Sequence, residues 1–269
     1  MRGASRAAFE SVREQLDGVL TSAGQARNVG DGLFAVTGLL DSEHGLRRAL
    51  SDPGKPAAEK SAIANQLLHG KITQVTEELV ASAVEKRWAS STDLADAIEE
   101  LGIESLARQA EYEGTLDDLE DELFRFARLV VAQPDLRTAL ASSAPAQLKE
   151  TLLGTLLHGK VTPVALNLIN QVVLHPRGRS LSAVLELCAQ VAADRKSQLI
   201  AVVRVAKDLT ARQRTRLAAA LSSAYEHKIH LNVLIDPAVV GGISIQIGDE
   251  LIDSTAAARL AAVRRKLAA

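Results

Sequence analysis

Apolar residues recur at helical spacing through the first 197 residues of the chain. Leu116, Leu119, Leu123, Phe126 and Val130, for example, form one apolar stripe at intervals of three and four residues. The same spacing, with Gly and Pro marking helix ends, predicts a series of further helices. They cover Gly32–Asp41, Ala57–His69, Gln74–Trp88, Thr92–Leu101, Ala146–His158, Pro163–Leu174 and Leu181–Ser197.

The period changes beyond residue 197, where apolar residues alternate with polar ones as in half-buried strands. Thr210 and Gln213 have the spacing of a capping box, which predicts the start of a helix. A last helix is expected over about 254–267, after a turn at Gly248-Asp249. The predicted strands are Leu199–Val205, Ile229–Ile235 and Ile243–Ile247.

The helical part repeats itself after about 90 residues. Leu33-Phe34 recurs as Leu123-Phe124, and Leu67-Leu68-His69-Gly70-Lys71 recurs as Leu156-Leu157-His158-Gly159-Lys160. Other pairs with the same offset keep the same order along the chain. Ordered matches that include an identical pentapeptide indicate a duplicated helical unit.

The predicted fold class is therefore mainly α, with duplicated N-terminal helical bundle domains followed by a small α+β C-terminal domain. We expect the first helical copy at 1–110, the second at 111–197 and the α+β domain at 198–269. Apolar residues make up 47% of the chain, which is enough to bury a core and excludes wholesale disorder.

The formal net charge of −2 hides a strong asymmetry along the chain. Residues 93–122 carry twelve acidic side chains and one basic side chain, Arg108, and we expect these acids to lie on solvated helix faces. The short basic clusters Arg177-Gly178-Arg179 and Arg264-Arg265-Lys266 are interpreted as solvated ends. The charge pattern and the low aromatic content of 3% both argue against nucleic-acid binding.

No set of residues has the spacing of a catalytic or metal site. His69-Gly70 and His158-Gly159 are expected to end helices, with each glycine in the left-handed conformation. His227 and His230 lack the further ligands that zinc requires. Cys188 lies on an apolar helix face, where a lone thiol is expected to pack.

Neither a phosphate-binding loop nor a membrane span is predicted. Gly241-Gly242 fits no nucleotide-binding fingerprint, and we expect these glycines to supply positive φ before a strand. The longest charge-free apolar stretch, 161–176, is too short and too polar to cross a bilayer. The N-terminus has no secretory signal pattern, so a cytosolic protein is expected.

The C-terminal part of the chain carries the most specific pattern. It reads Ile229-His-Leu-Asn-Val-Leu-Ile-Asp236-Pro237, then Gly241-Gly242-Ile243, then Ile247-Gly248-Asp249-Glu-Leu-Ile252-Asp253, then a helix with Arg259-Leu260. This pattern resembles the δ/OSCP family of F-type ATP synthases. The chain differs in having Asp253-Ser254-Thr255 where the family usually has Asp-Gly-Ser, and in its additional helical copy, so that it looks like a long form of the family.

The resemblance implies a stator, a subunit of the peripheral stalk with no catalytic activity, cofactor or metal. It implies that the helical domain binds N-terminal helices of α subunits and that the C-terminal domain binds C-terminal helices of the b subunit. It also implies a place at the cytoplasmic face of the plasma membrane through the complex, without direct insertion. The residues expected to bind partners are Ile229, Leu231, Val233, Gly241, Gly242, Ile243, Ile245, Ile247, Asp253 and Leu260.

Two other function classes remain open at this point. One is a helical scaffold or regulatory interaction protein, including one that binds nucleic acid through the basic clusters. The other is an enzyme, which has the least support because no nucleophile, base and orienting group are found together.

Overall fold

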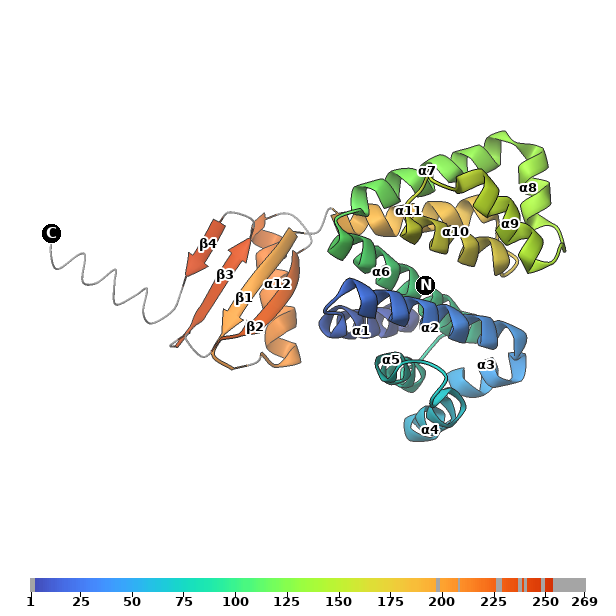
Figure 1. Cartoon of the computed structure of the whole chain (residues 1–269). Helices are drawn as coiled ribbons and strands as arrows, with labels where there is room; N and C mark the ends of the chain where they lie inside the picture. The colour runs from blue at the N-terminus through green and yellow to red at the C-terminus, as the bar shows by residue number, and fades with distance from the viewer. Residues whose placement is uncertain are drawn as a thin grey trace, which may run out of the picture. The chain divides into compact units, whose positions relative to one another are not determined.

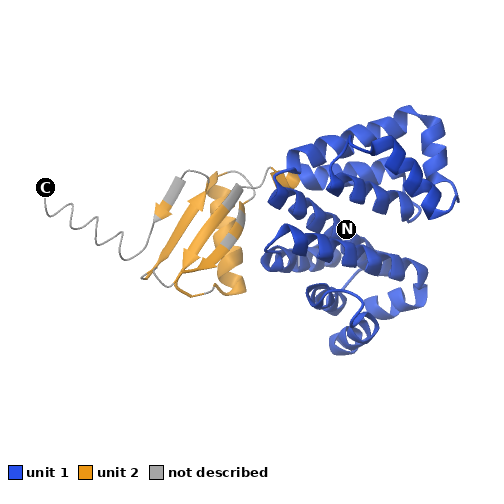
Figure 2. Ribbon diagram, in the orientation of Figure 1, with its two compact units in different colours: residues 1–193 blue, residues 194–269 orange. Residues whose placement is uncertain are grey.

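The chain divides into two compact units, Met1–Ala193 and Asp194–Ala269, which are coloured separately in Figure 2. The computed structural model describes residues 3–196, 199–207, 209–225, 229–236, 239, 241–247 and 250–253. Each unit has an apolar core of its own, so each is described by itself.

The larger unit is helical (Figure 1). Its helices, in chain order, are α1 (Ala4–Val19), α2 (Ala23–Ser42), α3 (His44–Ser51), α4 (Ala57–Leu68), α5 (Gln74–Glu85), α6 (Ser91–Glu113), α7 (Leu116–Ala132), α8 (Pro134–Ala141), α9 (Ala146–Leu157), α10 (Pro163–Leu174) and α11 (Leu181–Lys196). The order of long and short helices in α2 to α6 recurs in α7 to α11, which agrees with the predicted duplication. The domain boundaries near residues 110 and 197 stay a prediction.

The helix ends show the same repetition. Thr73 and Thr162 are the N-caps of α5 and α10, and each hydroxyl accepts a hydrogen bond from the backbone N–H three residues later. Gly70 and Gly159 follow α4 and α9 with φ of 73° and 68°, a conformation that glycine adopts without steric cost. The two identical pentapeptides are therefore helix ends, as predicted.

Two apolar cores fill the helical unit, and α6 contributes to both. The first core takes Leu94 to Leu101 of α6 together with α1 to α5. The second takes Ile103 to Ala110 of the same helix together with α7 to α11. Residues 101–110, where the two cores meet, are buried around the whole circumference of α6, which explains why this helix buries polar as well as apolar residues.

Helices α2 and α6 approach each other closely where glycines face the partner helix. A Cβ on Gly30 would lie 2.8 Å from Leu106 Cδ2, and a Cβ on Gly102 would lie 3.2 Å from the Phe34 ring. Both distances are shorter than ordinary contacts, so larger residues would push the two helices apart.

In its described residues the smaller unit is a four-stranded sheet with helix α12 (Ala211–Tyr225) over one face (Figure 1). The strands are β1 (Leu199–Val205), β2 (Ile229–Ile235), β3 (Ile243–Ile247) and β4 (Glu250–Asp253), in the order β2-β1-β3-β4. Strand β1 pairs in parallel with β2 and antiparallel with β3. Parallel pairing requires a crossover connection, and α12 supplies it.

Several predicted elements differ from the observed ones at their ends. Helix α2 begins at Ala23 instead of Gly32, and α6 runs on to Glu113 instead of ending at Leu101. Strand β4 has no counterpart among the predicted strands, and the expected turn at Gly248-Asp249 lies outside the described residues. The last predicted helix, 254–267, lies outside the described residues, as do His227 and the side chain of His230.

The expectation that all acids of residues 93–122 face solvent is wrong. Glu99 and Glu104 are buried on α6, with 5% and 4% of their surface exposed. Each has an arginine partner, and Arg13 Nη2 lies 2.8 Å from Glu104 Oε1. Burial of a carboxylate is costly unless it is paired, so the position of α6 between two cores demands these arginines.

Candidate functional site

The apolar residues predicted to bind partners form the core of the sheet. Ile229, Ile245 and Ile247 are buried beneath α12. The other apolar positions described, Leu231, Val233 and Ile243, are half-buried and pack against the same core. These side chains therefore hold the sheet together, and their partner-binding role stays a prediction.

The remaining predicted residues lie at the ends of strands. Gly241 and Gly242 are exposed before β3 with φ of 61° and 112°, in agreement with the expected positive φ. Asp253 ends β4 opposite Ser244. Leu260 lies outside the described residues. The exposed large apolar side chains described on this unit are Leu234, Ile235 and Ile252.

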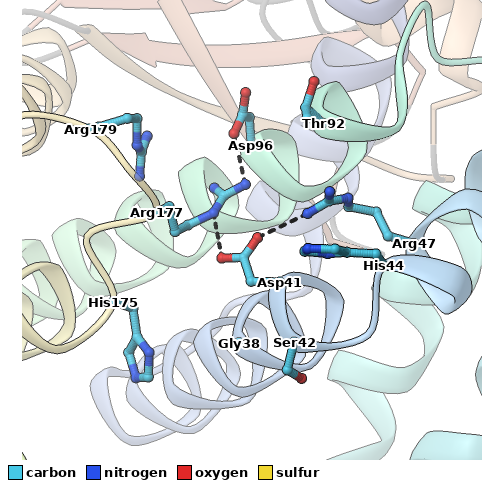
Figure 3. Close-up of a pocket in the computed structure, with 10 residues that line it drawn as sticks. All are labelled: Gly38, Asp41, Ser42, His44, Arg47, Thr92, Asp96, His175, Arg177 and Arg179. Atoms are coloured by element: carbon cyan, nitrogen blue, oxygen red, sulfur yellow. Dashed lines mark hydrogen bonds and ion pairs between the residues drawn. The ribbon is translucent and has the colours of Figure 1, made fainter.

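A cluster of ion pairs between the two helical cores was not predicted. The turn Arg177-Gly178-Arg179, which connects α10 to α11, is not a solvated end, and Arg177 exposes only 8% of its side chain. Arg177 Nε lies 2.6 Å from Asp41 Oδ2, Nη2 lies 2.9 Å from Asp96 Oδ1, and Nη1 donates to Glu99 Oε2 at 2.7 Å. The carboxylates come from α2 and α6, so one guanidinium joins three elements (Figure 3).

Two further arginines complete this cluster. Arg179 donates to both carboxylate oxygens of Glu99. Arg47, on α3, places its Nη1 3.4 Å from Asp41 Oδ1. Burial alone would lower the pKa of Arg177, but the carboxylates of Glu99, Asp41 and Asp96 outweigh it and raise the pKa above its ordinary value. The guanidinium is therefore permanently charged.

The ion pairs line an open cavity of about 700 Å³. His44 and His175 line it as well, and Figure 3 shows Arg177 reaching between Asp41 and Asp96. The guanidinium and carboxylate groups of the cluster neutralise one another. Arginines that are paired in this way are not available to nucleic-acid phosphates, so their role is to hold α2, α6 and the α10–α11 turn together.

Sequence reasoning missed this cluster because it interpreted the two arginines of the Pro-Arg-Gly-Arg turn as solvated. Arg177 has φ of +50°, which is rare outside glycine and has no signature in a single sequence. The available signal was the excess of acids in residues 93–122, since buried acids on a helix require cations from elsewhere in the chain.

The described residues hold no group of three or more His, Cys, Asp and Glu side chains placed to bind a metal ion. Among those residues, no helix is long and apolar enough to cross a membrane. Cys188 is buried on α11, where burial and then Glu99 raise the pKa of its thiol to about 12. A thiol with such a pKa is an unreactive packing group at neutral pH.

The fold defines a class of protein, a mainly helical chain with a second, smaller α+β unit. The family model for the ATP synthase delta (OSCP) subunit matches residues 103–267. The chain belongs to this family and is a non-catalytic subunit of the peripheral stalk, or stator, of ATP synthase.

Relatives match over the whole chain, including the additional helices. The chain is 45% identical to the ATP synthase subunit delta of Thermobifida fusca, with 100% of each chain covered. It is 44% identical to that of Streptomyces griseus, again with 100% of each covered. A chain in the cryo-EM structure of the Toxoplasma gondii mitochondrial ATP synthase hexamer matches 62% of this chain and 95% of its own length, at 21% identity and a TM-score of 0.27. The sequence relatives, rather than this weak structural likeness, establish the family.

Proposed function

We propose that the two compact units hold two different parts of ATP synthase. The helical unit binds N-terminal helices of α subunits, and the C-terminal unit binds the C-terminal helices of the b subunit. The membership of the family carries this proposal, and the separate cores of the two units support it. Joining two moderate affinities in one chain gives a strong hold through effective concentration, as a stator requires.

The proposed contacts differ between the two units. The sheet built on Ile229, Ile245 and Ile247 supports the surface for b, and the exposed side chains of Leu234 and Ile235 supply apolar contact area on strand β2. The helical unit offers faces suited to helix-in-groove docking. The chain then lies at the cytoplasmic face of the plasma membrane through its partners.

A truncation tests this function in the assembled enzyme. In a strain that produces the chain without residues 199–269, ATP hydrolysis by the catalytic head is expected to continue. Proton pumping into inverted membrane vesicles is expected to be lost, because the head is no longer held against the torque of rotation. Ile245→Asp should act in the same way, since it places an unpaired charge in the core of the sheet.

The two activities distinguish the possible outcomes. Full proton pumping by the truncated chain would contradict the proposal that the C-terminal unit is one of two attachments. Removal of this protein from the isolated catalytic head should leave the rate of ATP hydrolysis unchanged. A lower rate would contradict the non-catalytic role.

A further inference from the structure

One face of α2 binds the second half of the helical unit. Asp31 Oδ1 accepts a hydrogen bond of 2.9 Å from Asn167 Nδ2 of α10. Phe34, on the same face, is 6% exposed and belongs to the second apolar core. Asp41 forms the ion pair with Arg177. Asp31, Phe34 and Asp41, which share one face of α2, therefore all contact the part of the chain beyond residue 102.

The duplication places an equivalent face on α7. An offset of 90 residues takes Asp31, Phe34, Gly38 and Asp41 to the positions Asp121, Phe124, Arg128 and Val131. The face formed by these four α7 residues is exposed, with Phe124 at 49% and Val131 at 54%. Within α7, Asp121 pairs with Arg125, and the Arg128 guanidinium lies 5.8 Å from the centre of the Phe124 ring.

The docked face on α2 indicates what would bind the exposed face on α7. The amide of Asn167 lies opposite Asp31, and the small residue Gly102 makes room for Phe34. By the same chemistry, the α7 face requires an amide or a basic side chain opposite Asp121 and a small or apolar surface opposite Phe124. Charge along α7 is acidic at its N-terminal end, where Asp117 and Asp118 lie in the first turn, so a basic side chain of the partner belongs at that end, whereas Arg128 makes the other end of the face basic.

A second copy of this chain does not meet this requirement. The position in α5 that corresponds to Asn167, 89 residues earlier, is Glu78, which is exposed. Head-to-tail docking of two chains through the equivalent surfaces would bring Glu78 against Asp121, and like charges at that position oppose binding.

We propose that the α7 face of Asp121, Phe124, Arg128 and Val131 binds an amphipathic helix of another ATP synthase subunit, with a basic or amide side chain against Asp121. This proposal rests on the proposed function, because the partner is taken to be a neighbour in the same complex. The α7 face repeats in the second copy the docking role that α2 performs within the chain.

A single-cysteine experiment tests the proposal, since the only native cysteine, Cys188, is buried. Val131→Cys is labelled with a maleimide in the free full-length chain and in the purified ATP synthase complex. We expect labelling at position 131 to be at least tenfold slower in the complex. Adding Phe124→Asp should restore the fast rate in complexes that still contain the chain. Leu148→Cys, at an exposed position on α9, is the matched control and should keep its rate.

Each other result overturns the proposal. Equal labelling of Val131→Cys in the free chain and in the complex would do so while leaving the proposed function intact. Absence of the chain from the complex would overturn both proposals. Equal slowing at positions 131 and 148 would show general shielding rather than a docking face. In the free chain, faster labelling after removal of residues 254–269 would identify this chain's own C-terminal segment as the occupant, and slower labelling at higher concentration would identify a second copy.

Discussion

At the scale of single residues, burial decides what a charged side chain does. Arg177 and Arg6 are both arginines in short polar contexts, yet Arg177 is buried among three carboxylates and Arg6 is exposed beside Glu10. An exposed pair contributes little because water screens it. A buried guanidinium compensates carboxylates that would otherwise be desolvated without a partner.

Arg177→Met is expected to destabilise the chain by about 3 kcal/mol or more, because it removes the most buried cation of the cluster and leaves Glu99 and Asp41 with only the more exposed Arg179 and Arg47. Urea unfolding of the full-length chain measures this change. Arg6→Met, the control, should cost less than about 1 kcal/mol. Equal losses for the two variants would show that the Arg177 pairs do not stabilise the fold.

Cys188 is expected to resist alkylation in the folded chain. Burial raises the pKa of its thiol to about 12, so almost no thiolate is present at pH 8, and the side chain is inaccessible to the reagent as well. Mass spectrometry after iodoacetamide treatment should find almost no adduct in buffer and full labelling in denaturant. Rapid labelling in buffer would mean that α11 opens easily.

At the scale of elements, α6 joins the two helical cores, and its fit against α2 depends on glycine. A Cβ on Gly102 would lie 3.2 Å from the Phe34 ring, and one on Gly30 would lie 2.8 Å from Leu106. Side-chain volume at these positions sets the distance between the two helices. Because α6 contributes to both cores, a change in this distance affects the whole helical unit.

Gly30→Ala is expected to destabilise the helical unit by about 1–3 kcal/mol, since the new methyl group would lie 2.8 Å from a fully buried leucine. Thermal unfolding followed by circular dichroism measures it. Gly154→Ala in α9 is the matched control, because a Cβ there meets nothing within 4 Å. It should stabilise the helix by up to about 1 kcal/mol. A Gly30→Ala chain as stable as the wild type would contradict close packing of α2 on α6.

At the scale of the whole molecule, the chain consists of a helical unit and an α+β unit with separate cores. The helical unit buries most of the apolar residues, whereas the sheet has a small core beneath one helix. A small core supplies little stability of its own, so partner binding is expected to stabilise the C-terminal unit strongly.

Hydrogen exchange of the full-length chain should separate the two attachments. A peptide taken from the C-terminal end of b is expected to slow amide exchange in residues 199–253 and leave residues 4–113 unchanged. A peptide taken from the N-terminal end of α should do the reverse, with protection confined to the helical unit. Unchanged exchange in residues 199–253 upon addition of the b peptide would contradict docking on the C-terminal unit.

The amino-acid sequence by itself determined the elements whose signals are local. The bounds of α10, β1, β2 and β3 follow from Pro, Gly and the period of apolar residues, and the repeat predicted the order of the helices. The family pattern was readable too, because it depends on turn residues and strand alternation near the C-terminus.

Only the tertiary structure decided which charges and which apolar faces are buried. Asp41, Glu99 and Arg177 are far apart in sequence and became one cluster of ion pairs, with Glu99 and Arg177 buried, because α6 lies between two cores. Phe34 and Phe124 occupy equivalent positions of a repeat, yet one is buried and the other exposed. The local sequence pattern is the same at the two positions, but burial depends on what packs against the helix. In the described structure a following helical copy covers Phe34 and does not cover Phe124.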